Sequence, residues 1–112
     1  MKLGQFSISL NVKNIALSKQ FYETLGFVAH PECGSVVDKW LIMQHEKTVI
    51  GLFEGMFEHN IITFNPDDVR AIEQHLRSNN ITIDSPTSGT SGPTHCILND
   101  PDGNTIMFDQ HI

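Results

Sequence analysis

The chain has 112 residues, with 13 Asp and Glu against 7 Lys and Arg, and a formal net charge of −6. This length suits one compact domain, and an acidic balance without any Lys- or Arg-rich run argues against nucleic-acid binding. No apolar run approaches the length of a membrane span, and the N-terminus lacks the apolar region of a signal peptide. We therefore expect a cytoplasmic protein that binds neither nucleic acid nor membrane.

The first half of the chain begins with a strand. Apolar and polar residues alternate strictly over Phe6–Val12, which is typical of a strand with one buried face. Phe6 and the alternate apolar residues should face a core. Ser7, Ser9 and Asn11 should face a wetter environment.

A helix should follow over Asn14–Leu25. Asn14 is a good N-cap residue, and Gly26 stands where a left-handed residue commonly ends a helix. The apolar residues recur every four positions, which predicts one buried helical stripe: Leu17, Phe21 and Leu25.

Short strands should complete the first half. Residues 27–38 predict a short strand and a loop, and Trp40–Gln44 with Thr48–Phe53 predict a hairpin. Residues 55–59 then connect the halves. Their Met56 and Phe57, with Phe53, either line a groove mouth, form a dimer contact, or lie buried between the halves.

The second half repeats this order. We expect a strand over Ile61–Phe64, a helix that starts at Pro66, and a final hairpin of His95–Leu98 and Thr105–Phe108. The buried stripe of this second helix should consist of Val69, Ile72 and Leu76.

One segment of the second half predicts a flexible loop. Asp84–Pro93 has no apolar side chain besides two prolines, a composition typical of irregular surface chain. Two readings stay open for it: a solvated connector and a lid over a pocket.

The repetition predicts the fold class. Each half has the pattern strand, helix, three short strands, so two βαβββ modules of about residues 1–57 and 58–112 are expected in one domain. Neither module could bury its helix-covered sheet alone. Together they should form an α+β protein with one curved mixed sheet, helices on its convex face and a groove on its concave face.

Two motifs carry a resemblance to a known family. The segments Phe21–Phe27 (FYETLGF) and Asp100–Asn104 (DPDGN), with the repeated order of elements, resemble the vicinal oxygen chelate superfamily. That group includes glyoxalase I, extradiol dioxygenases, fosfomycin-resistance transferases and bleomycin-binding resistance proteins. The resemblance covers essentially the whole chain, but both motifs are structural and specify no single activity.

The resemblance also implies where a metal would bind. Enzymes of this superfamily typically hold a divalent ion with His, Glu or Asp at up to four groove positions. Those positions correspond here to Ser7, Gly51, Met107 and, depending on a one-residue register choice, His59 or Asn60. We favour His59, because it keeps Phe64 in the core. One imidazole does not hold a catalytic ion, so we expect no metal and no other cofactor.

The resemblance then favours a metal-independent protein that binds a small organic molecule in its groove, and a homodimer. Bleomycin-type resistance proteins are the nearest family model. Small, uncharged residues at the metal positions suit an apolar or aromatic ligand. The expected ligand-binding residues are Ser7, Ser9, Asn11, Trp40, Gly51, Phe53, His59 and Met107.

An enzyme is the alternative function. His59 with Glu54 or Asp109 as acid and base would suit a divergent lyase, isomerase or dioxygenase-like enzyme. A relocated metal site would instead combine these three residues with His111. The two cysteines, Cys33 and Cys96, lack metal-type spacing, and reduced thiols are the simpler interpretation.

Overall fold

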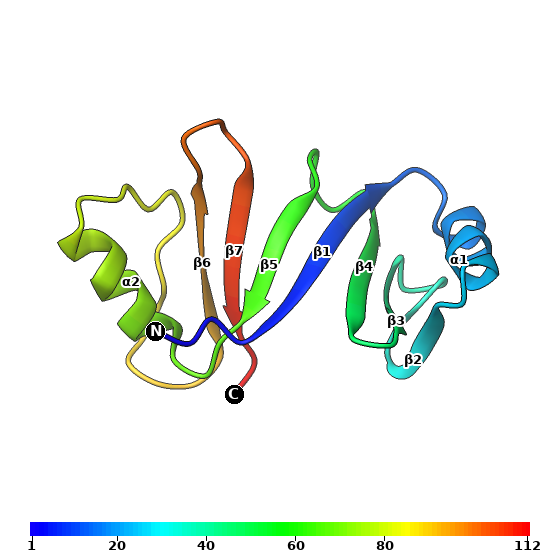
Figure 1. Cartoon of the computed structure of the whole chain (residues 1–112), viewed down its shortest axis with the longest axis horizontal. Helices are drawn as coiled ribbons and strands as arrows, with labels where there is room; N and C mark the ends of the chain where they lie inside the picture. The colour runs from blue at the N-terminus through cyan, green and yellow to red at the C-terminus, as the bar shows by residue number, and fades with distance from the viewer. The chain divides into compact units, whose positions relative to one another are not determined.

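The computed structural model describes all 112 residues. It contains seven strands and two helices, and none of its helices is long and apolar enough to cross a membrane. The elements, labelled in Figure 1, are β1 (Gln5–Val12), α1 (Ile15–Thr24), β2 (Val28–Ser35), β3 (Trp40–His45), β4 (Thr48–Glu54), β5 (Ile61–Asn65), α2 (Val69–Ser78), β6 (Thr94–Asn99) and β7 (Thr105–Gln110).

The chain divides into two compact units. The first unit is Ser7–Asn60, and the second unit is Ile61–Ile112 together with Met1–Phe6. The N-terminal residues pack with the second unit, since Leu3 contacts its core and the rings of Phe6 and Phe64 lie 5.6 Å apart. The expected modules 1–57 and 58–112 therefore differ from these units mainly in the first six residues.

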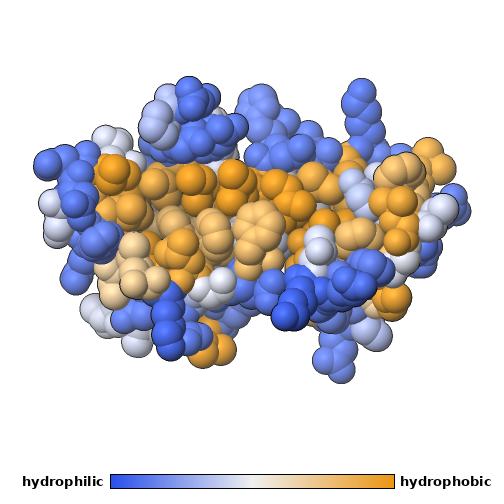
Figure 2. All heavy atoms as spheres, viewed as in Figure 1, coloured by the Kyte–Doolittle hydropathy of each residue, from blue (hydrophilic) through white to orange (hydrophobic).

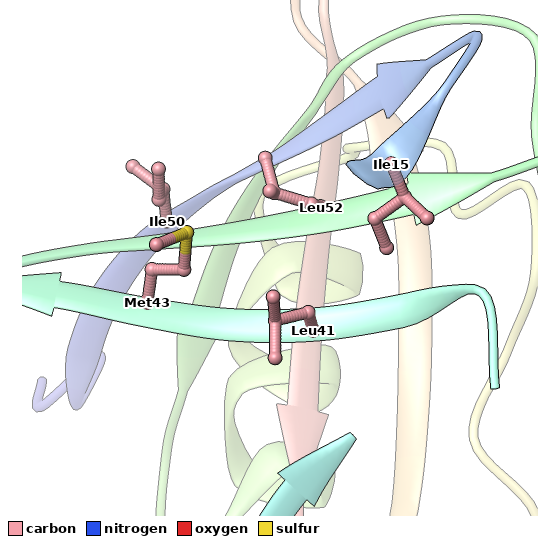
Figure 3. Packing of buried hydrophobic residues seen from close by; sticks show 5 residues of the cluster. All are labelled: Ile15, Leu41, Met43, Ile50 and Leu52. Carbon is pink, nitrogen blue, oxygen red and sulfur yellow. The ribbon is translucent and has the colours of Figure 1, made fainter. Parts of the chain in front are cut away.

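The first unit pairs its strands in the order β2-β3-β4-β1, with β1 parallel to β4 and the other pairs antiparallel. Side chains alternate between the two faces of a strand, so one face collects the apolar residues beneath α1. Figure 3 shows this core, which consists of Ile15, Leu41, Met43, Ile50 and Leu52. Ile8, Leu10 and Val12 pack against it, as the alternation predicted.

Helix α1 begins and ends as predicted. The Asn14 side chain accepts a hydrogen bond from the Leu17 amide at 3.2 Å, which satisfies one of the free amides of the first turn. Gly26 follows the helix with φ +104°, in the left-handed region that glycine tolerates. The local sequence therefore determines both ends of this helix.

The predicted buried stripe of α1 is wrong. Leu17, Phe21 and Leu25 are 63%, 60% and 55% exposed. The helix instead contacts the core through Ile15, which is 2% exposed, and Tyr22. The four-residue spacing identified an apolar helix face correctly, but the neighbouring face is the one that packs on the sheet.

The second unit pairs its strands in the order β5-β7-β6, with β5 parallel to β7. Its core consists of Val69, Ile72, Cys96, Leu98 and Phe108, with Phe64 and Leu76 packed against it. The predicted stripe of the second helix is therefore confirmed.

The start of α2 differs from the prediction. The helix begins at Val69 rather than Pro66, and the Asp68 side chain caps it by accepting a hydrogen bond from the Ala71 amide at 3.1 Å. Two helix-start signals, Pro66 and Asp68, follow one another, and the prediction used the first of them. The Asp68 side chain at the N-cap accepts a hydrogen bond from an amide of the first turn, which a proline side chain cannot do.

The second unit has two regular strands after its helix, where three were predicted. The missing strand is reduced to an isolated bridge between Ser85 and Ile97. Pro86 and Pro93 interrupt this segment, and proline has no amide to donate to a strand ladder. The same composition that predicted a loop therefore prevented the strand.

Candidate functional site

The face of the first sheet opposite α1 brings most predicted ligand-binding residues together. We call this surface the distal face: Ser7, Ser9, Asn11, Trp40, Ile42, Gly51 and Phe53. Strand pairing places Asn11, Phe53 and Trp40 in one row and Ser9, Gly51 and Ile42 in the next. Five of the eight predicted positions thus lie in two adjoining rows, and Ser7 shares their face.

Two of the three polar side chains on the distal face are buried. Ser7 and Ser9 are only 8% and 4% exposed, so the expectation of a wetter environment holds only for Asn11, which is exposed. Figure 2 shows apolar side chains at the surface on the side of the molecule that is seen in Figure 1. Among the distal-face residues, the aromatic rings and Asn11 are the most accessible for contact with another molecule.

Three aromatic rings form a continuous row on this face. The rings of Trp40 and Phe53 lie nearly parallel, with centroids 6.5 Å apart and an angle of 12°. Phe57 tilts against Phe53 by 50° at 5.3 Å. All three side chains are partly exposed. Of the alternatives for residues 55–59, this contact favours a position beside the predicted groove for Phe57.

Two glycines make room for these rings. A side chain at Gly51 would lie 2.5 Å from the Phe53 ring, and one at Gly34 would lie 2.8 Å from the Trp40 indole. A larger residue at Gly51 would displace the Phe53 ring, whereas at Gly34, where φ is +86°, it would meet the Trp40 carbonyl oxygen as well as the indole. Gly51 is one of the metal-ligand positions implied by the resemblance, and here the Phe53 ring covers it.

Asparagines hold the segment that precedes β5. The Asn11 amide donates to Asn60 Oδ1 at 2.9 Å, and Asn11 Nδ2 donates to the Glu58 carbonyl at 3.1 Å. Phe64 packs in the second core, as the favoured register predicted. His59, the groove position of that register, lies before β5 and is exposed.

Glu54 lies on the other side of the first sheet. It pairs with Val12 rather than with the distal-face residues, and its Oε1 accepts a hydrogen bond from the Ile15 amide at 3.0 Å. Its Oε2 lies 3.5 Å from the Lys39 ammonium. The carboxylate therefore satisfies the start of α1, and it does not face the predicted site.

The remaining predicted residues belong to the second unit. Met107 lies between Thr63 and Ile97 on the sheet face opposite α2, and Asp109 shares that face next to His95. Asp109 Oδ2 and His111 Nε2 lie 3.2 Å apart. Among the four residues of the expected relocated metal site, Asp109 and His111 are the only two that are in contact within one unit.

The residues at the family's metal positions do not fit a divalent ion. Ser7 is buried, Gly51 lies under the Phe53 ring, and Met107 offers only a soft thioether. His59 alone is an imidazole, and no group of three or more His, Cys, Asp or Glu side chains is arranged to hold a metal. The donor set therefore gives no basis for a metal-assisted step.

Sequence reasoning missed an arginine that holds the predicted loop. Arg70 on α2 donates hydrogen bonds of 2.7 to 3.2 Å to four backbone carbonyls of the loop. These carbonyls belong to Ser88, Gly89, Ser91 and Gly92. A lone Arg in a helix carries no sequence signal for this role. These hydrogen bonds favour the interpretation of Asp84–Pro93 as a connector held against α2 over its interpretation as a mobile lid.

A carboxylate reinforces the same loop. Glu73 accepts hydrogen bonds from the Thr87 amide and hydroxyl at 2.9 and 2.7 Å, and Arg77 lies 3.5 Å away. Burial raises the pKa of Glu73, but the hydrogen bonds from Thr87 and the charge of Arg77 outweigh it and hold the pKa below its usual value.

Two further groups have shifted pKa values. Burial, with the charge of Glu73, raises the pKa of the Cys96 thiol to about 11, and both Cys96 and Cys33 are free thiols. Hydrogen bonds from Asn104 hold the pKa of Asp100 below its usual value in the predicted final turn. Neither group lies on the distal face.

The second unit contains a cleft. This cleft of about 410 Å³ lies between the N-terminal residues and α2. It contains no predicted site residue, and its lining consists of Met1, Lys2, Asp67, Asp68, Ala71, Ile72 and His75.

The amino-acid sequence matches the model of a known protein family. A model of the Glyoxalase/Bleomycin resistance protein/Dioxygenase superfamily matches residues 3–108. A search of curated protein sequences finds no match.

Several solved structures are similar to the chain. A structure described as NAD-dependent benzaldehyde dehydrogenase from Legionella pneumophila has 19% identity and a TM-score of 0.76, covering 96% of this chain and 99% of that one. A superfamily member from Vibrio splendidus 12B01 has 15% identity and a TM-score of 0.73, covering 94% and 97%. Methylmalonyl-CoA epimerase from Mycobacterium tuberculosis has 12% identity and a TM-score of 0.70, covering 100% and 93%. At these identities the structures confirm the predicted fold class and nothing finer.

Proposed function

The chain belongs to the glyoxalase/bleomycin resistance protein/dioxygenase superfamily, and from this premise we propose that it is a metal-independent protein that binds a small, flat aromatic molecule on its distal face. The row of Trp40, Phe53 and Phe57 carries the proposal. Partly exposed aromatic rings on a sheet face bind flat apolar ligands by stacking and by removing apolar surface from water.

The arrangement of the rings supports a flat ligand. Trp40 and Phe53 differ by only 12° in orientation, so a flat ligand can lie parallel to both rings, and Phe57 lies tilted beside Phe53. Asn11 lies in the same row, and its side-chain oxygen can accept one hydrogen bond from a ligand. Stacking with a single polar contact is typical of small-molecule pockets.

The charges favour a neutral or cationic ligand. No Lys or Arg occupies a position on the distal face, and the chain carries a net charge of −6. Aromatic faces attract cations and do not attract carboxylates. We therefore expect neutral or cationic aromatic rings to bind more tightly than anionic ones of the same shape.

The experiment uses Trp40, the only tryptophan in the chain. We would titrate 2-naphthol, N-methylacridinium and 2-naphthoate while following Trp40 fluorescence and the thermal midpoint. We expect 2-naphthol and N-methylacridinium to quench the fluorescence and raise the midpoint, and 2-naphthoate to do so more weakly. Phe53→Ala should weaken binding roughly tenfold, because it removes one stacking surface.

The control is Phe21→Ala, which removes an exposed ring from α1 on the other side of the first unit. Its affinity for the probes should equal that of the unmodified protein. Unchanged fluorescence with all three compounds, or equal affinities in Phe53→Ala and the unmodified protein, would overturn the binding proposal.

The proposal that ligand binding needs no metal has a separate test. Metal analysis of the purified protein and thermal midpoints with Ni, Zn, Mn and Fe ions should reveal no stoichiometric ion and no large stabilisation. One tightly bound ion whose stabilising effect disappears in His59→Ala would favour the alternative, a metalloenzyme with relocated ligands.

A further inference from the structure

The cleft between the N-terminal residues and α2 takes no part in the binding proposal above. The N-terminus of the chain lies beside α2 (Figure 1), and Met1 and Lys2 line the cleft from that side. The cleft lies wholly within the second unit. Its volume of about 410 Å³ falls within the range of ~300–1,000 Å³ that small-molecule pockets occupy. The cleft is therefore large enough to hold a small ligand of its own.

One face of α2 forms the opposite side of the cleft. The residues that line this side are spaced by three or four positions and so lie on one face of the helix: Asp68, Ala71, Ile72 and His75. Ile72 is 2% exposed, so it forms the floor. Seven residues of helix extend over about 10 Å. The helix face thus begins with a carboxylate, continues over an apolar middle and ends at an imidazole.

Charged side chains of both signs line the cleft without pairing. Lys2 and Asp67 take part in none of the ion pairs of the chain, either with each other or with another residue. Asp68 uses Oδ1 to cap α2, which leaves its Oδ2 available. A ligand that carries both an ammonium and a carboxylate can form a charge-assisted hydrogen bond with each of these groups.

We propose that this cleft binds an α-amino acid with an aliphatic side chain. The ammonium of the ligand pairs with Asp67 and with Oδ2 of Asp68, and its carboxylate pairs with Lys2. Its side chain covers Ala71 and Ile72, which removes apolar surface from water. The cleft thus offers an anion, a cation and an apolar floor, which match the three groups that an α-amino acid carries on one carbon atom.

The first experiment compares L-leucine with compounds that each lack one of these groups. 3-Methylbutylamine lacks the carboxylate, 4-methylpentanoate lacks the ammonium, and glycine lacks the side chain. L-leucine should shift the amide NMR signals of residues 67–75, which line the cleft, and should leave those of the distal face unchanged. We expect a Kd of about 1 mM, as for a small ligand in an open cleft, and binding of each truncated compound that is weaker by about fivefold or more.

The second experiment assigns each charge to its partner. Asp67→Asn removes a charge and keeps the size of the side chain, so it should weaken the binding of L-leucine about fivefold without weakening that of 4-methylpentanoate. Lys2→Gln should also weaken the binding of L-leucine, but not that of 3-methylbutylamine. The matched controls are Asp102→Asn and Lys47→Gln, which change exposed residues outside the cleft. Both controls should bind L-leucine like the unmodified protein.

Three outcomes would contradict the proposal. Unchanged signals of α2 at about 50 mM L-leucine, well above the Kd expected for a ligand of this size, would show that the cleft does not bind it. Equal affinities for L-leucine and the two compounds with a single charge would show that the cleft does not recognise a zwitterion. Equal affinities for L-leucine in Asp67→Asn and Asp102→Asn would place its binding elsewhere. Thermal midpoints without ligand separate loss of folding from loss of binding in each variant.

Discussion

The two helices occupy equivalent places in the two halves of the chain but have opposite surfaces. Both have ten residues and follow the first strand of their half. Helix α2 packs its apolar residues on the sheet and uses charged residues to hold a loop. Helix α1 packs through Ile15 and Tyr22 and leaves its other apolar residues exposed.

Apolar periodicity along a helix identifies an apolar side but does not determine whether that side is buried. In α2 it supplies the core of a single unit, and the polar side then takes part in tertiary contacts of its own. In α1 the apolar side exceeds what the core covers, so that Leu17, Phe21 and Leu25 stay exposed. Equivalent helices of a duplicated fold thus bury their apolar side in one half and leave it exposed in the other.

The largest effect should come from comparing leucines inside and outside the first core. Leu52 is 0% exposed, whereas Leu17 is 63% exposed. Leu52→Ala should lower the free energy of unfolding by about 2–5 kcal/mol, because it leaves a cavity. Leu17→Ala should change it by less than ~0.5 kcal/mol in the monomer. Urea denaturation at low protein concentration measures both, and similar losses would contradict the placement of α1.

An intermediate effect should come from two arginines of α2. Arg70→Ala removes donors to four loop carbonyls and should lower the free energy of unfolding by ~1–2 kcal/mol. It should also accelerate amide exchange over residues 88–92. Arg77→Ala removes one ion pair, in which the Arg77 side chain is 53% exposed and the Glu73 side chain 13% exposed, and it should cost at most about 1 kcal/mol. Equal exchange rates in the two variants would show that Arg70 does not fasten the loop.

The smallest effect concerns one thiol in each unit. Burial raises the pKa of Cys96 to about 11, so at pH 8 only about one Cys96 thiol in a thousand is ionised. Cys33 is partly exposed. Iodoacetamide at pH 8 should label the folded protein once, at Cys33, and should label Cys96 only after denaturation. Mass spectrometry counts the adducts, and rapid double labelling of folded protein would contradict the burial of Cys96.

The sequence predicted local features well. Strand alternation placed Ile8, Leu10 and Val12 against the first core, Asn14 and Gly26 ended α1 as expected, and the stripe of α2 was correct. These features depend on neighbours within a few residues, which a single sequence contains. The family motifs added the fold class and the positions at which metal ligands would lie.

Strand alternation in the sequence also indicated that most of the predicted site residues share one sheet face. Asn11, Trp40 and Phe53 share one row because period-two alternation fixes which side chains share a face. It misplaced Glu54 as a partner for the site, since that carboxylate caps α1 from the opposite face. Whether the distal-face residues bind a ligand stays a prediction.

By itself, then, the sequence determined most of the helices and strands, which residues share a strand face, and which family the chain resembles, but it did not determine the start of α2 or the lost strand of the second unit. Only the tertiary structure decided which side of α1 packs on the sheet, that the Phe53 ring covers Gly51, and that Arg70 fastens the loop. The physical reason is range: capping and alternation act between near neighbours, whereas these three outcomes depend on which surfaces meet across the fold.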